Sequence, residues 1–284
     1  MNYLMTLFLA SLIAFPIAAD DKPAAKPADE QVEKERATLA LDLCRKAAKE
    51  YRLCLDDGRR TELELKPEPF LKWSNPSVGS IHGGVFLWTH QGRPAAVASI
   101  FKWFDPRDEM AFEVQSLSAE RLVGLLGTKD AWHSTRAGLE FKPVPESPPA
   151  PASTPNARLI QMRTISASFT ADKTDRDDNS QQRMRLLTQP IFRYSSPKED
   201  ITDGALFAFV QGTDPEVFLQ IEARETKSGT AWHYGLSRMN STAFRVRYKD
   251  QDAWAVEVVP WGIVFNNREP YNILNLDHLY RPKK

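Results

Sequence analysis

Apolar side chains recur every three to four residues in two parts of the chain, and both predict an amphipathic helix. In residues 31–52, small and apolar residues share one face, with Arg, Lys and Glu opposite. In residues 157–171, Leu159, Met162 and Ile165 keep a similar spacing. Each half of the chain is therefore predicted to open with one helix.

Each predicted helix is followed by short apolar runs of the kind that form β-strands. Two runs, residues 85–89 and 95–103, flank a Gln-Gly-Arg-Pro turn, which predicts a hairpin. Residues 243–248 alternate apolar and basic side chains, which predicts an antiparallel sheet with one solvent-facing side. The predicted strands are residues 61–65, 69–73, 85–89, 95–103, 111–117, 184–187, 232–239, 243–248 and 253–259.

The chain also repeats itself at a distance of about 121 residues. Residues 69–76 align without a gap on residues 190–197, with aromatic on aromatic, cation on cation and proline on proline. Surface turns tolerate a small change in this distance, whereas a slip inside a strand would turn every side chain to the wrong face. Three further blocks align at the same or a slightly larger distance: residues 83–88 on 204–209, 130–132 on 252–254 and 138–141 on 262–265.

Together these patterns predict an α+β fold of two tandem repeats. Each repeat would place an N-terminal helix on an antiparallel β-meander of about five to seven strands. The first repeat spans residues 31–142, and the second spans residues 157–284 with a C-terminal extension predicted to pack back onto the second domain. Residues 143–156 are rich in proline and predict a semi-rigid linker. Whether the two sheets are separate or continuous stays open.

The start of the chain predicts export. Residues 4–17 are almost entirely apolar, then come small residues and charge, and the apolar stretch is short for a bilayer span. We predict a signal peptide at residues 1–19, a disordered spacer at residues 20–30 and a secreted or periplasmic location. The segment before the apolar stretch carries no Lys or Arg, so an uncleaved anchor is the competing interpretation.

The charge balance and the hydropathy of the chain exclude two classes of partner. The chain has 37 basic and 37 acidic residues, so we predict no nucleic-acid partner, which would need a basic surface. No later stretch is apolar enough to predict a membrane span after signal cleavage.

The two cysteines could form a disulfide only if the helix ends between them. On a continuous helix Cys44 and Cys54 would lie about 15 Å apart, beyond disulfide reach. They are either two buried thiols or a bridge that requires the helix to end near Lys49.

The sequence contains no clear motif for catalysis, phosphate binding or metal binding. The sequence has no Gly-x-Ser-x-Gly elbow and no phosphate-binding Gly-rich loop with a lysine. The five histidines lack the spacing of a zinc site, although His82 and His90 flank one predicted strand and could converge with Glu113. Acidic pairs fall in predicted turns, where Asp favours local backbone bonds. We therefore predict no catalytic residue, no metal ligand and no cofactor.

The seven tryptophans are the remaining candidates for ligand-binding residues. Four have an aromatic counterpart in the other repeat and predict core packing. Trp103, Trp232 and Trp261 have none, and could form a stacking platform for sugars or peptides or cover the domain interface. The sequence favours a non-catalytic binding or interaction module of the cell envelope, with a protein or polymer as partner. The alternative is an exported hydrolase whose site uses residues unique to one repeat.

Overall fold

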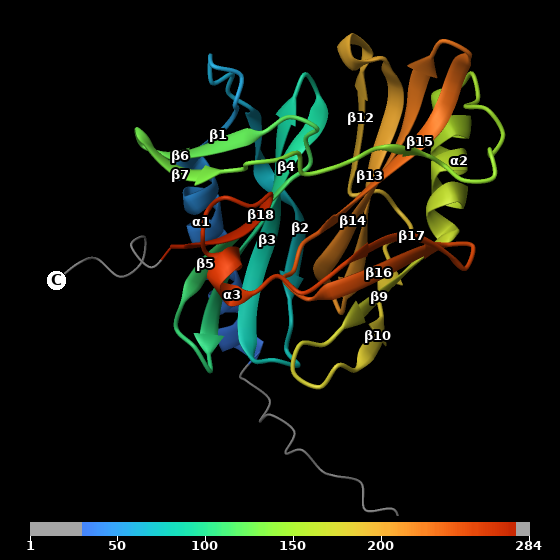
Figure 1. Ribbon diagram of the computed structural model, residues 1–284. Coiled ribbons are helices and arrows are strands. Elements are labelled where there is room, and N and C mark those ends of the chain that lie inside the picture. Colours follow the sequence, from blue (N-terminus) through green and yellow to red (C-terminus); the bar gives the residue numbers. More distant parts are fainter. Residues whose placement is uncertain (1–29, 277–284) are drawn as a thin grey trace, which may run out of the picture.

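The computed structural model describes residues 30–276, a range that contains three α-helices and several antiparallel sheets (Figure 1). α1 (Glu30–Glu50) continues directly into β1 (Tyr51–Leu55), and α2 (Pro155–Ala167) is followed at once by β9 (Phe169–Thr174). The sequence prediction ran both helices several residues too far. Tyr51 and Phe169 fit the helical spacing, but they pair with strands distant in sequence. The predicted signal peptide and nearly all of the predicted spacer lie outside the described residues.

The first large sheet is a meander with one strand added at its edge. Its order is β18-β5-β4-β3-β2. Between β3 and β4 the chain turns through Gln91 and Gly92, both with positive φ, as a tight hairpin requires. The strands are β2 (Glu64–Ser74), β3 (Ser80–His90), β4 (Arg93–Asp105), β5 (Met110–Ser116) and β18 (Tyr271–Asn275).

The second large sheet has the same central meander, ordered β13-β14-β15. Its edges are formed by β11 and β12, which both pair with β13, and by β8, which pairs with β15. The short 3₁₀ helix η1 (Pro197–Glu199) joins β12 to β13. The strands are β8 (Lys142–Pro143), β11 (Arg185–Leu186), β12 (Phe192–Ser196), β13 (Ile201–Gln211), β14 (Asp214–Thr226) and β15 (Gly229–Arg238).

Two small sheets complete the fold, ordered β1-β6-β7 and β10-β9-β16-β17. The alternation predicted for residues 243–248 is found in β16, where Phe244, Val246 and Tyr248 are buried and Arg245 is exposed. The remaining elements are β6 (Leu122–Leu126), β7 (Lys129–His133), β10 (Gln181–Arg183), β16 (Ala243–Tyr248), β17 (Gln251–Val256) and the short helix α3 (Trp261–Val264).

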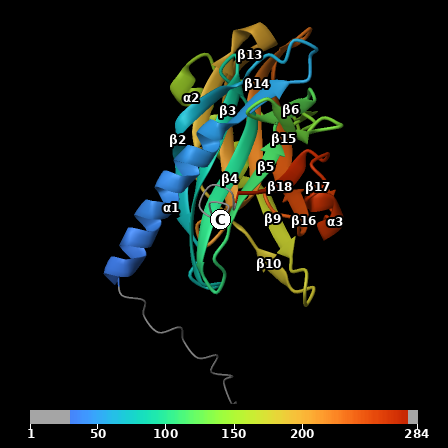
Figure 2. The same cartoon turned by 90° about the vertical axis from the view of Figure 1, so that its left-hand side faces the viewer.

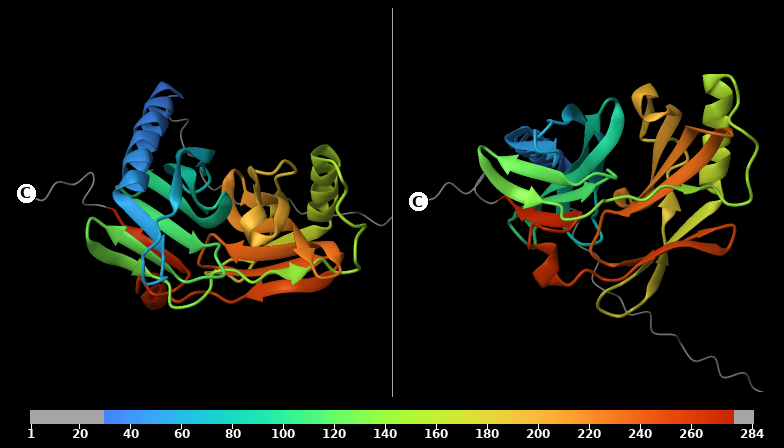
Figure 3. Two further views of the ribbon diagram at one scale, coloured as in Figure 1. Left: turned by 90° about the horizontal axis from the view of Figure 1, so that it is seen from above. Right: turned by 45° about the horizontal axis from the view of Figure 1, so that its top comes forward.

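The two large sheets are separate and pack face to face, with a helix on each outer side (Figure 3). Successive side chains of β3 show the layering: Val85 and Leu87 face the second sheet, whereas Phe86 and Trp88 face the core beneath α1. Figure 2 shows α1 lying across β2 and β3. The central strands are therefore buried on both faces, whereas β16 of the small sheet β10-β9-β16-β17 alternates between buried and more exposed side chains.

The halves exchange edge strands. β18, which follows the second half, pairs with β5 of the first, and β8, which follows the first half, pairs with β15 of the second. The predicted packing of the tail onto the second domain was wrong for β18, because the free edge of β5 offered the backbone hydrogen bonds that a strand needs. The predicted tail contacts of Leu279 and Tyr280 lie outside the described residues.

The two cysteines are buried thiols without a bridge. Cys44 lies in α1 and donates its thiol proton to the carbonyl oxygen of Ile100 over 3.0 Å. Burial raises the pKa of Cys44 to about 12, so the thiol stays protonated. No helix within residues 30–276 has both the length and the apolar character needed to cross a membrane.

Candidate functional site

Two of the three tryptophans singled out by the sequence lie at one pocket. Trp103, near the end of β4, and Trp261, at the start of α3, both line a pocket of about 550 Å³ where the shared core between the large sheets ends. Trp232 in β15 lies elsewhere: it is buried in the core of the second half, and its Nε1 donates to the carbonyl oxygen of Pro149 over 3.1 Å. Trp232 is therefore a core residue in this structure.

We call this cavity the acidic pocket, after Glu113, Asp214 and Glu216, which line it together with Lys173. Glu113 comes from β5 of the first half, and the other three come from β9 and β14 of the second. The carboxylates outnumber the ammonium groups at the centre of the pocket. A ligand here would contact both halves of the chain.

Glu216 is the most buried of the three acids, with 1% of its surface exposed. Its Oε1 accepts a hydrogen bond from Lys173 Nζ at 2.5 Å, and the same Nζ donates to Gln211 Oε1 at 3.0 Å. The Oε2 of Glu216 is buried without a hydrogen-bond partner. Leaving a buried carboxylate oxygen without a donor is costly, so this atom favours a ligand that brings one.

The acids also raise one another's pKa. Burial and the nearby charge of Glu216 raise the pKa of Glu113 to about 8. Burial and the charges of Glu216 and Glu113 raise the pKa of Asp214 well above its usual range. Lys173 offsets only part of this repulsion. At neutral pH the acids of the pocket therefore retain protons that a bound cation would displace.

The proposed convergence of His82, His90 and Glu113 does not occur. His82 Nε2 lies 2.8 Å from Glu33 Oε2 on α1, and His90 Nδ1 lies 3.6 Å from Glu199 Oε1. Glu113 faces the acidic pocket instead. Within residues 30–276 no three His, Cys, Asp or Glu side chains are grouped closely enough to hold a metal ion.

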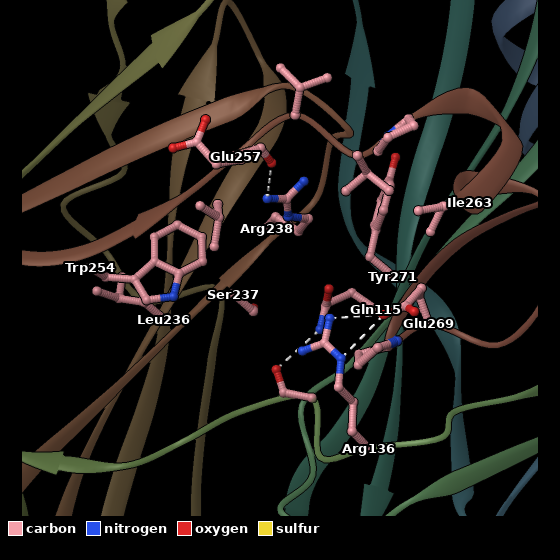
Figure 4. A pocket seen from close by; sticks show the side chains of 16 residues that line it. Gln115, Arg136, Leu236, Ser237, Arg238, Trp254, Glu257, Ile263, Glu269 and Tyr271 are labelled. Atoms are coloured by element: carbon pink, nitrogen blue, oxygen red, sulfur yellow. Dashed lines mark hydrogen bonds and ion pairs between the residues drawn. The ribbon is translucent and has the colours of Figure 1, made fainter.

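A second cavity, of about 470 Å³, lies on the other side of α3, and we call it the arginine pocket (Figure 4). Ile263 lines it, whereas Trp261 and Phe265 line the acidic pocket. Its polar lining is Gln115, Arg136, Ser237, Arg238, Glu257, Glu269 and Tyr271, and its apolar wall includes Leu236, Trp254, Val256 and Pro270.

Arg238 is buried at the end of β15, with 8% of its surface exposed. Burial, with positive charge from Arg136 and Arg176 nearby, lowers the pKa of Arg238 to about 10. The group is still a cation at neutral pH. It is therefore an uncompensated positive charge at the edge of a cavity.

Sequence reasoning missed most of these residues, although one usable signal existed. Asp214 and Glu216 fall at the repeat distance from Arg93 and Ala95, so the two halves differ in charge at both positions. Comparisons with protein-family models, curated proteins and solved structures found no significant match to this chain.

Proposed function

We propose that the chain is an exported, non-catalytic binding protein of the cell envelope, formed by internal duplication, and that the acidic pocket holds its ligand. The duplication is supported by strand pairing. The order β2-β3-β4-β5 in the first half corresponds to β12-β13-β14-β15 in the second, and β1-β6-β7 corresponds to β9-β16-β17. α1 and α2 contact the equivalent strands of their own halves.

Side-chain contacts at the repeat distance support the same proposal. Trp73 Nε1 in β2 donates to Ser99 Oγ in β4 over 2.9 Å. At the equivalent positions, the Tyr194 hydroxyl in β12 accepts from Gln220 Nε2 in β14 over 3.0 Å. In both halves an aromatic side chain on the first strand of the meander thus forms a hydrogen bond with a side chain at the equivalent position of the third strand, although the donor and acceptor groups differ.

The ligand site is proposed where the halves differ. Arg93, at the repeat distance from Asp214, lines a smaller pocket of about 270 Å³ in the first half. There Arg93 is bound by Glu199 at 2.7 Å and Glu222 at 2.8 Å. Glu222 also accepts from the Tyr194 hydroxyl and from Arg224, at 2.7 Å each, so this buried carboxylate is saturated with donors.

The contrast between the two buried glutamates carries the proposal. Glu222 has charged donors on both oxygens, whereas Glu216 has Lys173 on one oxygen, no hydrogen bond on Oε2, and the neutral Asn240 side chain as a further neighbour. Buried charges are normally paired, so the pocket around Glu216 favours a cation from outside the chain. The class of ligand we propose is an organic amine, whose ammonium would meet the carboxylates while its body lies along Trp103 and Trp261.

The tryptophans already hold cations in this structure. The Arg107 guanidinium carbon lies 5.1 Å from the Trp103 ring centre, and that of Arg176 lies 4.3 Å from the Trp261 ring centre. Both rings are therefore placed where cation–π attraction operates. Because the rings already have these cations, a ligand ammonium would bind the carboxylates, with its body beside the rings.

Calorimetric titration of the mature protein with benzylamine tests the proposal. We expect binding to wild type, no binding of uncharged benzyl alcohol, and about 10-fold or greater loss in Glu216→Gln and Asp214→Asn, as expected for charge-assisted hydrogen bonds. Proton release should accompany binding, because the amine displaces protons from the acids. Glu62→Gln removes an exposed carboxylate elsewhere and serves as the matched control. Equal binding of benzyl alcohol, or full affinity in both pocket variants, would contradict the site.

One observation favours the alternative of an exported hydrolase. The pKa of Glu113 is raised to about 8, and a carboxyl group that is protonated near neutral pH can serve as a general acid. Glu113, Asp214 and Glu216 would then act together on a glycosidic or ester bond. Hydrolysis of a chromogenic glycoside or ester by wild type, abolished in Glu113→Gln, would favour this function over simple binding.

A further inference from the structure

Arg238 lacks the partner that a buried arginine normally has. Its Nη2 donates to the backbone carbonyl oxygen of Glu257 over 2.7 Å, and its Nη1 is buried without a hydrogen-bond partner. Figure 4 shows the guanidinium among the lining residues, with the Glu257 side chain pointing away from it. Among residues 30–276 no carboxylate lies within ion-pair distance of Arg238.

Two other buried arginines in this chain are paired with carboxylates. Arg158 is 9% exposed, and its Nε donates to Asp203 Oδ2 over 2.8 Å. Arg93, also 9% exposed, is held by two glutamates. Arg238 is equally buried, but its hydrogen-bond acceptor is a single backbone carbonyl oxygen. Because a guanidinium has five N–H donors in a planar fork, several donors of Arg238 are left for another acceptor.

The surroundings of Arg238 fit a small anion with an apolar body. The Ser237 hydroxyl, which also lines the pocket, is buried without a hydrogen-bond partner. Arg136, on the pocket rim, is already held by Glu269 at 2.8 Å. Apolar side chains, among them Trp254 and Ile263, form another part of the wall. A cavity of about 470 Å³ is the size of a small-molecule site.

We propose that the arginine pocket is a second binding site, which takes a small organic carboxylate. The carboxylate bonds the Nη1 and Nη2 groups of Arg238, and its apolar body lies against Trp254 and Ile263. A carboxylate matches the planar guanidinium fork in a bidentate geometry, and the apolar wall selects against fully hydrated inorganic anions. This site is a different cavity from the acidic pocket and is centred on a cation, so it does not depend on the function proposed above.

Benzoate is the probe, with benzyl alcohol as its uncharged equivalent and inorganic phosphate as an anion without an apolar body. Titration calorimetry and thermal denaturation are run on the full mature protein. We expect benzoate to bind and to raise the melting temperature, and benzyl alcohol and phosphate to do neither at the same concentration. Equal binding of benzyl alcohol or phosphate would overturn the proposed ligand class.

Two variants test the role of Arg238. Arg238→Met keeps an unbranched side chain and removes the unpaired charge, so it should fold at least as stably as wild type yet bind benzoate about 10-fold more weakly or worse. Arg52→Met changes an exposed, ion-paired arginine and should leave benzoate affinity unchanged. Glu216→Gln should also keep benzoate binding, which separates this site from the acidic pocket. Unchanged benzoate affinity in Arg238→Met, or no benzoate binding in wild type, would overturn the proposal.

Ser237→Ala gives a second measurement that does not alter charge. The variant removes one buried hydroxyl from the lining of the pocket and should weaken benzoate binding several-fold while wild-type stability is retained. If Arg238→Met does not fold, the benzoate affinity of Ser237→Ala still tests the proposed site. Benzoate binding to Ser237→Ala with wild-type affinity would then count against the site.

Discussion

Gly204 in β13 lies directly against the ring of Tyr194 in β12, because a Cβ added to Gly204 would come 2.6 Å from Cε2 of Tyr194. Gly83 in β3 has the same relationship to Trp73 in β2, with a distance of 2.7 Å to Cε2. Neither glycine has a positive φ, so their role is to let an aromatic ring cross the backbone. The sequence alignment of these four positions thus corresponds to one packing contact made twice.

Replacing either glycine should therefore destabilise the fold. We expect Gly204→Ala and Gly83→Ala each to lower the free energy of unfolding by about 1–3 kcal/mol, because the new methyl group overlaps an aromatic ring. Gly262→Ala is the control, since its added Cβ would meet no atom within 4 Å. Urea denaturation measures all three. Wild-type stability in both strand variants would mean that the rings move aside without cost.

The matched tryptophans Trp132 and Trp254 should differ in their effect on stability. Trp132 is 1% exposed, and its Nε1 donates to the carbonyl oxygen of Glu269 over 2.8 Å, so Trp132→Ala should cost about 3–5 kcal/mol. Trp254 is only partly buried and lines the arginine pocket. Trp254→Ala should cost about 1–2 kcal/mol, since less apolar surface is removed from contact. Equal losses in denaturation experiments would contradict this ranking.

Cutting the chain between residues 147 and 155 should not separate the halves. Leu87 and Val97 share one core cluster with Leu206 and Phe218, and β8 and β18 each pair with the other half. We expect a protease site inserted there to yield two fragments that co-elute in gel filtration under native conditions and separate in denaturant. Native elution as two folded fragments would show that the shared core contributes little.

The stability of the protein should fall as pH rises toward 8. Burial raises the folded-state pKa of Glu113 from 4.5 to about 8, so the folded chain binds a proton that the unfolded chain releases in this range. The stabilisation is complete below the unfolded pKa and is lost as pH rises through the folded pKa. Glu113→Gln should remove about 1–3 kcal/mol of this pH dependence, a moderate value because the side chain is partly exposed. If the free energy of unfolding changes with pH in the same way in wild type and in Glu113→Gln, the prediction is wrong.

The sequence predicted the hairpins, the positions of α1 and α2 and the burial of Trp73, Trp88 and Trp132 from local signals. It was wrong for Trp254, which is only partly buried, and for Trp232, which lies in the core. Gln91 and Gly92 mark a turn by conformational preference alone, and Trp88 is buried because its surface is too apolar for water. Such features depend on residue type and spacing within a few positions. The end of α1 was less predictable, because Tyr51 suits both a helix face and a strand.

The sites were decided by the tertiary structure. Glu113, Lys173 and Glu216 are far apart in the chain and meet only because the two large sheets stack and β9 crosses their end. Arg238 lacks a carboxylate because of which neighbours surround it, and no property of its own sequence segment reveals that. Local sequence therefore determined which segments became helix or strand, whereas desolvation and charge pairing, which depend on distant neighbours, were set by the packing of the halves.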